Sequence, residues 1–143
     1  MSKLRKDDCP FCLNQKRGYT KIVIGGNEVN NCVLYEANDF FVFRDPFPVV
    51  KDHMLIVTRA HIPDCLMIRP LAWLELPDII RKIMRMLKEF DPSIVGYNLG
   101  LNSGKSAGQT VMHCHFHLFP RRKGDVENPR GGIRNFKTPI MKY

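Results

Sequence analysis

Three of the five histidines in the chain occupy alternate positions of one short segment, HCHFHLF (residues 113–119). Side chains alternate between the two faces of a β-strand, so a strand here places the imidazoles on one face and Cys114, Phe116 and Leu118 on the other. An ordinary strand with one solvent-facing side also fits this pattern. Serine, threonine or lysine would serve such a side equally well, so the repeated imidazole predicts a functional site.

The spacing limits what the three histidines can do together. On a regular strand His113 and His117 stand about 13 Å apart, whereas zinc holds its nitrogen ligands at about 2.1 Å. Neighbouring imidazoles can share an ion, but the outer two cannot easily do so. We therefore expect the triad to divide its work and to leave at least one histidine for chemistry. A neutral imidazole is a good nucleophile near neutral pH and can form a phosphoimidazole that water cleaves.

A CxxC pair, Cys9-Pro10-Phe11-Cys12, has the spacing of a zinc knuckle. A redox pair of this kind usually follows a strand and opens a helix in a βαβ unit, which the sequence does not indicate here. Two further zinc ligands are needed, and His53, His61 and the triad can supply them. The other cysteines are interpreted as small buried apolar residues: Cys32, Cys65 and Cys114.

The loop before the triad, GKSAGQT (104–110), can offer backbone N–H groups, Gln109 and Thr110 to phosphate oxygens. Without the triad it would be interpreted as an ordinary turn. Together with the preceding residues it resembles a P-loop. However, three residues rather than four separate the first glycine from Gly-Lys, and a strand rather than a helix is expected to follow. We reject the P-loop interpretation.

The formal net charge of +8 favours an anionic partner, although charge alone does not separate a nucleotide from a nucleic acid. Much of this charge lies in RRKGDVENPRGGIRNFK (121–137), for which a solvated basic tail is an equally good interpretation. Five cysteines, an N-terminus unlike a secretory signal and no long apolar run predict a cytoplasmic protein with reduced thiols and no membrane partner.

Apolar patterning predicts an α+β fold. Strands are expected at 32–36, 40–45, 53–58, 94–102 and 111–119, the first two as a hairpin. The principal helix is expected over 74–90, and Pro77 either lies in its first turn or kinks a helix that begins near Pro70. This order predicts an antiparallel sheet of about five strands with one main helix and a short one. We expect a single domain over 1–143, with a zinc-knuckle segment (1–20) and a basic tail (121–143).

The segment HCHFHLF fits His-φ-His-φ-His-φ-φ, where φ is apolar, and so resembles the signature of the histidine triad (HIT) family. AGQTVMHCHFHLFPR, DHMLIVTRAH and FRD resemble further family segments in the family's order, and CPFC resembles the N-terminal pair of its zinc-bearing members. The resemblance covers most of the chain. It implies a HIT-like fold, a homodimer, and a hydrolase or transferase acting on a nucleoside 5′-phosphoryl compound, either a dinucleoside polyphosphate or a nucleoside phosphoramidate.

The resemblance also implies residue roles. His115 would attack the α-phosphorus and form a nucleotidyl-histidine that water hydrolyses to a nucleoside monophosphate. The implied substrate contacts are Asp45 to the ribose, and His53, Asn102, Gln109, Thr110 and His117 around the phosphate or leaving group. The implied ligands of a structural zinc are Cys9, Cys12, His61 and His113. Mg²⁺ could accompany a polyphosphate substrate.

Two positions depart from the family pattern. Asp52 replaces the usual glycine and is expected to add a negative charge beside His53, which could change substrate preference. Thr58-Arg59 replaces Pro-Lys. The tail HLFPRRKGDVENPRGGIR suggests the dinucleoside-polyphosphate branch of the family, and its arginines would suit a longer polyphosphate.

Two alternatives stay open. One is a zinc-stabilised basic module that binds nucleotide or, less expectedly, nucleic acid without catalysis; its nucleic-acid affinity would fall steeply with salt. The other is a metal-dependent hydrolase that uses triad histidines as ligands, and chelation would inactivate it without unfolding it.

Overall fold

The computed structural model describes residues 7–16, 21–24, 27–30 and 33–135. The helices are α1 (Pro10–Lys16) and α2 (Pro70–Phe90), with 3-10 turns η1 (Cys65–Met67), η2 (Lys105–Ala107) and η3 (Gly132–Arg134). The strands are β1 (Lys21–Ile24), β2 (Asn27–Asn30), β3 (Val33–Glu36), β4 (Phe40–Arg44), β5 (Met54–Thr58), β6 (Ile94–Gly100) and β7 (His115–Arg122). None of the helices in these ranges is both long enough and apolar enough to cross a membrane.

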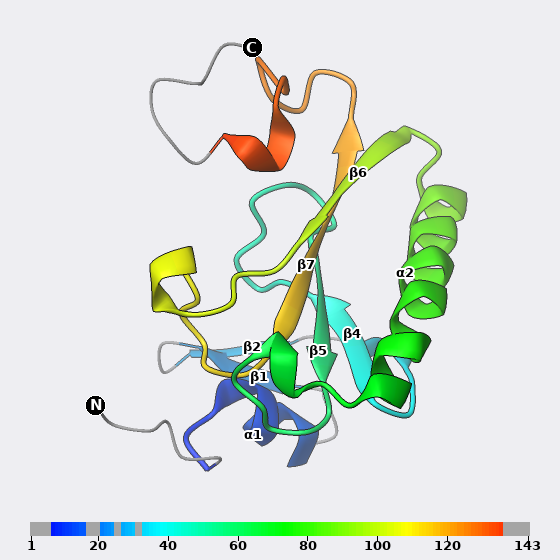
Figure 1. Ribbon diagram of the computed structural model, residues 1–143. Helices are drawn as coiled ribbons and strands as arrows, with labels where there is room; N and C mark the ends of the chain where they lie inside the picture. The colour runs from blue at the N-terminus through cyan, green and yellow to red at the C-terminus, as the bar shows by residue number, and fades with distance from the viewer. Residues whose placement is uncertain (1–6, 17–20, 25–26, 31–32, 136–143) are drawn as a thin grey trace.

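Five strands form one antiparallel sheet in the order β3-β4-β5-β7-β6. The expected α+β fold with a five-stranded antiparallel sheet is therefore confirmed. Strands β1 and β2 form a separate two-stranded sheet, which the sequence analysis missed. In the sheet order the outer strands are β3 and β6, and the triad strand β7 lies inside, between β5 and β6 (Figure 1).

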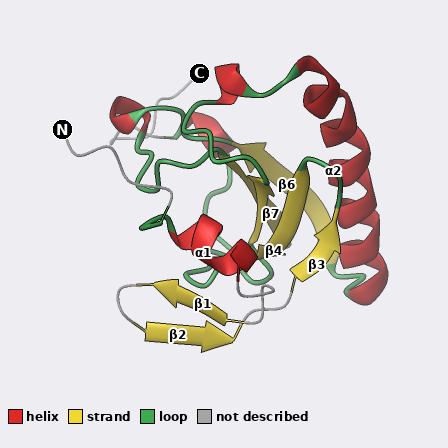
Figure 2. Ribbon diagram, turned by 90° about the horizontal axis from the view of Figure 1, so that it is seen from below, coloured by secondary structure: helices red, strands yellow, loops and turns green. Residues whose placement is uncertain are grey.

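The two faces of the five-stranded sheet have different partners (Figure 2). One face packs against α2 and forms the larger core, with alternate residues of β4, β5 and β7 such as Val42, Ile56 and Leu118. The other face carries Phe43, Leu55 and their neighbours, and α1 packs there. Since His117 pairs with Leu55 across the sheet, it belongs to the α1 face. The sheet thus separates the α2 core from the histidine side chains.

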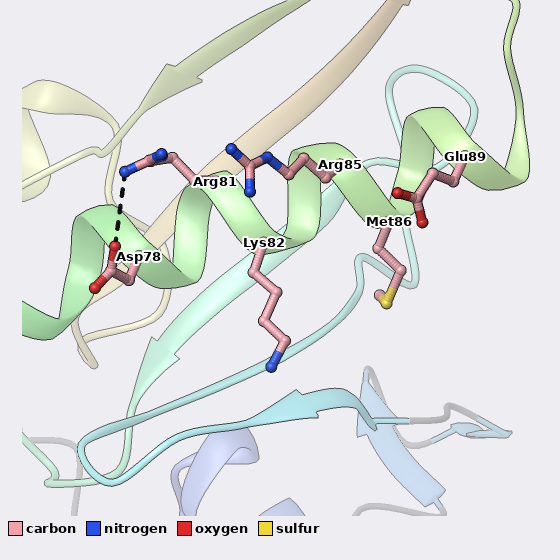
Figure 3. Close-up of a pocket in the computed structure, with 6 residues that line it drawn as sticks. All are labelled: Asp78, Arg81, Lys82, Arg85, Met86 and Glu89. Atoms are coloured by element: carbon pink, nitrogen blue, oxygen red, sulfur yellow. Dashed lines mark ion pairs between the residues drawn. The ribbon is translucent and has the colours of Figure 1, made fainter.

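Helix α2 begins at Pro70 and contains Pro77. The interpretation in which the helix begins near Pro70 is therefore correct about the helix start, and Pro77 lies inside the helix rather than in its first turn. Proline suits the first turn of a helix because the N–H group there has no partner within the helix. The buried residues recur at helical spacing: Ala72, Leu76, Ile79, Ile83 and Leu87. The outward face is charged and includes the ion pair of Asp78 with Arg81 at 3.9 Å (Figure 3). This face lies across the sheet from the histidines.

Several predicted boundaries were displaced. The triad strand begins at His115, not at residue 111, and runs to Arg122, so two arginines assigned to the tail belong to the sheet. Cys114 is buried as expected, and burial raises the pKa of its thiol to about 12, which makes it unreactive. Cys65 is only half-buried and lies 3.7 Å from the Ser103 hydroxyl, contrary to the expectation of burial. Cys32 lies outside the described residues.

Candidate active site and metal centre

The triad is split by the start of β7. His115 and His117 are in the strand, opposite Val57 and Leu55 of β5, whereas His113 precedes it. The backbone of residues 111–114 is irregular: the N–H of His113 donates to the carbonyl of Val111 and that of Cys114 to the carbonyl of Ile62. Because His113 is free of strand geometry, its imidazole can serve a different site from the two histidines that follow.

His113 joins a four-residue cluster with both cysteines of the knuckle and His61. Its Nδ1 lies 3.4 Å from Cys9 Sγ, 3.6 Å from Cys12 Sγ and 3.3 Å from His61 Nδ1. A tetrahedral zinc ion with Zn–S of about 2.3 Å and Zn–N of about 2.1 Å sets two nitrogen ligands about 3.4 Å apart and a nitrogen and a sulfur about 3.6 Å apart. These four residues therefore have both the donor chemistry and the spacing of a structural zinc site.

The second nitrogen of His113 fixes which atom faces this cluster. Its Nε2 lies 2.6 Å from the carbonyl of Thr58, so Nε2 carries the proton and donates. Nδ1 is then the unprotonated nitrogen, as a metal ligand must be. Burial lowers the pKa of His113 to about 4, which keeps the ring neutral at physiological pH. Thr58, which departs from the family pattern, accepts this hydrogen bond through its backbone carbonyl rather than its side chain.

His115 is oriented by a hydrogen bond that its side chain donates to the backbone carbonyl of His113. Its Nδ1 lies 2.7 Å from the carbonyl of His113, so Nδ1–H donates and Nε2 keeps its lone pair. Burial lowers the pKa of His115, so the ring remains neutral at physiological pH. Phe11, between the two knuckle cysteines, packs edge-on against both rings, 5.5 Å from His113 and 5.2 Å from His115 between centroids. The His113 carbonyl and the Phe11 ring thus hold His115 from two sides, next to the candidate metal cluster.

His53, His117 and Asp45 form a second cluster on the same face. His53 Nε2 and His117 Nδ1 are 2.9 Å apart, a hydrogen-bond distance and shorter than two nitrogens on one zinc ion allow. Val49 N–H donates to His53 Nδ1 at 3.4 Å, so neutral His53 donates from Nε2 to His117. His117 then carries its proton on Nε2. Burial lowers the pKa of His53 against the opposing effect of Asp45, and burial lowers that of His117 to about 4.

The loop before the triad is held by Gln109. The side-chain oxygen of Gln109 accepts from Gly104 N–H at 2.8 Å, and its NH₂ donates to the carbonyls of Pro63 and Val111 at 2.9 and 3.0 Å. With these bonds in place the Gln109 side chain shapes the loop, and its role as a substrate contact stays a prediction. The other two predicted contacts from this region, Asn102 and Thr110, are exposed.

The backbone and the partners of Asp52 explain how aspartate fits where the family pattern has glycine. Its backbone has φ of +64°, the left-handed region in which glycine is favoured, and aspartate tolerates it better than most residues. Its carboxylate is nearly buried and lies 2.6 Å from Arg122 and 3.3 Å from Arg44. Arg122 also binds Asp91 at 2.8 Å, at the end of α2. The negative charge expected beside His53 is therefore compensated by two arginines.

The arginines at the end of β7 were expected to suit a polyphosphate, but both are engaged within the protein. Arg122 binds Asp52 and Asp91, and Arg121 binds both oxygens of the Asp125 carboxylate at 2.8 and 2.9 Å. Sequence reasoning missed three supporting residues of the site: Phe11, Arg122, and Phe119, whose ring packs against those of His53 and His117. Of these, Phe11 could have been found from its place inside the CxxC knuckle.

Comparison with known proteins agrees with this geometry. The HIT domain profile matches residues 26–124, more than half of the chain. The chain belongs to the HIT family. It is 35% identical over 138 residues to an uncharacterized HIT-like protein of Methanocaldococcus jannaschii, covering 89% of this chain and 90% of that one.

Two named relatives are enzymes. A bis(5′-nucleosyl)-tetraphosphatase (asymmetrical) of Schizosaccharomyces pombe is 31% identical over 68% of this chain and 53% of its own length. An adenosine 5′-monophosphoramidase of Candida albicans is 30% identical over 80% of this chain and 70% of its own length. A solved zinc-bound histidine triad family protein from Mycobacterium smegmatis is 28% identical, with a TM-score of 0.68, and the match covers 85% of this chain and 80% of that one.

Proposed function

We propose that this HIT protein is a hydrolase that cleaves a nucleoside 5′-phosphoryl compound through a nucleotidyl intermediate on His115. The observation that carries the proposal is the 2.7 Å hydrogen bond from His115 Nδ1 to the carbonyl of His113. This bond leaves the Nε2 lone pair available, and the lowered pKa of the ring keeps that lone pair unprotonated at neutral pH.

In the first step the Nε2 lone pair forms a bond to the α-phosphorus, and the bond from phosphorus to the leaving group breaks. The leaving group departs with that electron pair and takes up a proton. The His113 carbonyl stabilises the positive charge that develops on the His115 ring. His117 Nε2–H and N–H groups of the 104–110 loop would donate to the phosphoryl oxygens, where negative charge grows.

In the second step water attacks the phosphorus, the phosphorus–nitrogen bond breaks, and its electron pair returns to Nε2. The attacking water releases one proton to solvent, which balances the proton that the leaving group took up in the first step. A nucleoside monophosphate is released and the neutral histidine is restored. Asp45 lies beside His53 and would accept the ribose hydroxyls. Asn102, Gln109 and Thr110 would contribute around the phosphate or the leaving group.

The proposed substrate classes follow those named for the relatives: a dinucleoside polyphosphate or a nucleoside phosphoramidate. We favour the dinucleoside polyphosphate, and the formal charge of +8 suits a multiply charged anion. The His53 cluster fits Mg²⁺ poorly, because it offers two imidazoles and only one carboxylate, whereas Mg²⁺ prefers oxygen ligands and water.

We further propose that Cys9, Cys12, His61 and His113 hold a structural zinc ion. When bound, zinc would link α1 to the β5–β7 region and so stabilise the fold. Through the carbonyl of His113 and the ring of Phe11 the same cluster would keep His115 in place.

A homodimer is proposed on the exposed edge of the sheet. β6 is an outer strand in the sheet order, and Val95 on it is 69% exposed. Large apolar side chains are also exposed near the start of α2: Leu66, Met67, Leu71 and Leu74. A second copy that paired with β6 would satisfy the edge and cover apolar surface.

The test is a chromatographic assay with diadenosine tetraphosphate and adenosine phosphoramidate, run on the parent protein and on His115→Ala. We expect AMP from the parent and a loss of at least about 10³-fold in kcat for the variant, since removal of a nucleophile abolishes the covalent route. Quenching of the parent in alkaline denaturant should trap the nucleotidyl-histidine, because the phosphorus–nitrogen bond of a phosphoimidazole survives in base but is hydrolysed in acid.

Circular dichroism and zinc content should be unchanged in His115→Ala, which separates lost chemistry from lost folding. If the parent cleaves neither substrate but binds nucleotide, the non-catalytic binding module becomes the better account. If the variant retains parental activity, the nucleophile assignment is wrong.

A further inference from the structure

A cavity of about 380 Å³ opens at the end of β7 that is farther from the metal cluster. Segments from four parts of the chain line it: Val49 and Val50 before β5, Asn98 of β6, Phe119 and Arg121 of β7, and the segment 126–135. The last of these includes η3, which lies beside the far end of β6 and β7 (Figure 1). The mechanism proposed above makes no use of this cavity.

The cavity begins at the end of the proposed catalytic cluster, which consists of Asp45, His53 and His117. Phe119 follows His117 on the same face of β7, and successive residues of one face lie about 6.6 Å apart along a strand. The Phe119 ring contacts His53 at 4.3 Å and is parallel to that of His117 at 5.7 Å between centroids. Val49, on the opposite wall, bonds His53 through its N–H. A group leaving the phosphorus beside His117 can therefore enter this space directly.

The chemistry of the lining favours a neutral ring over a phosphate. The guanidinium of Arg121 is paired with Asp125, and it also donates to the side-chain oxygen of Asn98 at 2.7 Å. Its positive charge is thus compensated within the protein. Val49 and Ile133 remain 72% and 60% exposed and can contact a ligand, and Phe119 adds an aromatic surface.

The amide groups supply polarity without charge. The oxygen of Asn98 accepts from Arg121, and that of Asn128 accepts from the N–H of Arg130 at 3.2 Å. The NH₂ groups of these two amides have no hydrogen-bond partner among the described residues, so they can donate to the ring nitrogens or carbonyl oxygens of a base. Apolar and aromatic walls with a few amide donors, in a volume within the usual range of about 300–1,000 Å³, match a nucleobase.

We propose that this cavity is a subsite for the nucleoside of the leaving group. The chain would then recognise both ends of a dinucleoside polyphosphate: one nucleotide is transferred to His115 and the other departs through contacts with Phe119, Val49 and Ile133. This inference rests on the proposed function and deepens it. A phosphoramidate, whose leaving group has no base, would gain nothing from the subsite.

The kinetic test compares the two substrates on Ile133→Ala and Ile133→Asp. For diadenosine tetraphosphate we expect kcat/KM to fall about five- to tenfold in Ile133→Ala, equal to about 1.0–1.4 kcal/mol, and further in Ile133→Asp. For adenosine phosphoramidate kcat/KM should change less than about twofold, because its leaving group carries no base to enter the cavity. Phe90→Ala, also at an exposed apolar residue but at the end of α2, is the matched control and should change neither substrate.

A binding measurement keeps the proposal testable if turnover is absent. On His115→Ala, calorimetry should give a several-fold tighter affinity for diadenosine tetraphosphate than for AMP, and Ile133→Ala added to it should remove most of that advantage. Equal losses for both substrates, or no loss at all, would overturn the subsite. Failure of the parent to cleave either substrate would count against the proposed function alone.

Discussion

The two histidine clusters lie on one face of one sheet, yet they differ in how their nitrogens meet. In the metal cluster the His61 and His113 Nδ1 atoms are 3.3 Å apart, and in the catalytic cluster His53 Nε2 and His117 Nδ1 are 2.9 Å apart. The first distance leaves space for a shared ion, whereas the second is that of a direct hydrogen bond. Similar side chains are thus spaced for a metal ion in one place and for a direct hydrogen bond in the other.

The difference comes from the backbone and from the partners. His113 lies outside β7 and meets two thiols, whose thiolate forms are strong zinc ligands. His117 is held in β7 opposite Leu55 and meets His53 and Asp45. Only four residues of the chain therefore separate a candidate metal ligand, His113, from a proposed phosphate contact, His117, and His115 between them touches both clusters.

Removal of the proposed zinc ion should have the largest effect, on both stability and activity. Apparent binding free energies of structural zinc are about 10–16 kcal/mol in zinc-finger peptides, comparable with the whole stability of a small domain, about 5–15 kcal/mol. A strong chelator, or Cys12→Ser, should lower the unfolding temperature steeply and abolish activity in parallel. Thermal unfolding and activity are measured on the same samples.

His117→Ala is the matched control, since it removes an imidazole from the catalytic cluster only. It should keep its zinc and its unfolding temperature while losing activity. If chelation instead inactivates the parent at an unchanged unfolding temperature, the metal is catalytic, and the metal-dependent hydrolase replaces the covalent mechanism.

Phe11 tests whether the metal cluster supports catalysis through packing. It is 4% exposed and contacts His113 and His115, so Phe11→Leu should cost about 1–2 kcal/mol of stability and Phe11→Ala about 3–5 kcal/mol. In Phe11→Leu we expect kcat to fall about tenfold with little change in KM, because a less well oriented His115 raises the activation free energy by about 1.4 kcal/mol.

Phe116→Leu is the matched control, because Phe116 is equally buried in β7 but packs on the other face against Trp73. Both variants should bind zinc as the parent does, as colorimetric titration of the metal can establish. A positioning role for Phe11 is contradicted if the two variants lose the same fraction of kcat.

Much of this site could be predicted from the sequence because its signals are local. Alternating histidines and a CxxC pair constrain residues close together in the chain, and the apolar periodicity of α2 fixed its buried face. The break in the strand before His115 could not be predicted, since it depends on hydrogen bonds from residues 113 and 114 to Val111 and Ile62. Strands β1 and β2 also lacked a pattern strong enough to be recognised.

The roles of Gln109 and Arg122 depend in part on partners far away in the sequence, such as Pro63 for Gln109 and Asp52 for Arg122. The Gln109 amide has the chemistry of a phosphate contact, but in the structure it is hydrogen-bonded to the backbone of Gly104, Pro63 and Val111. Arg122 appeared to belong to a basic tail, and its carboxylate partners, Asp52 and Asp91, come from two different segments. Residue type predicted the chemistry available at each position, and only the fold determined where it was used.

Substitution of Asp52 has the smallest expected effect. It tests the support of the loop that carries His53, which depends on ion pairs rather than on a metal. Asp52→Ala loses the bonds to Arg122 and Arg44 while keeping a side chain at φ of +64°. Asp52→Gly loses the same bonds but adopts the left-handed backbone conformation without steric strain. It should therefore be about 1 kcal/mol more stable than Asp52→Ala. Urea unfolding of both variants measures that difference.

Neither Asp52 variant should change zinc content, since the carboxylate belongs to the support of the catalytic cluster alone. Arg122 keeps Asp91 as a partner, so we expect Asp52→Ala to lose about 1–3 kcal/mol rather than the larger penalty of an isolated buried charge. Equal stability of the alanine and glycine variants would mean that the left-handed backbone carries no strain, and that Asp52 occupies a glycine position at no conformational cost.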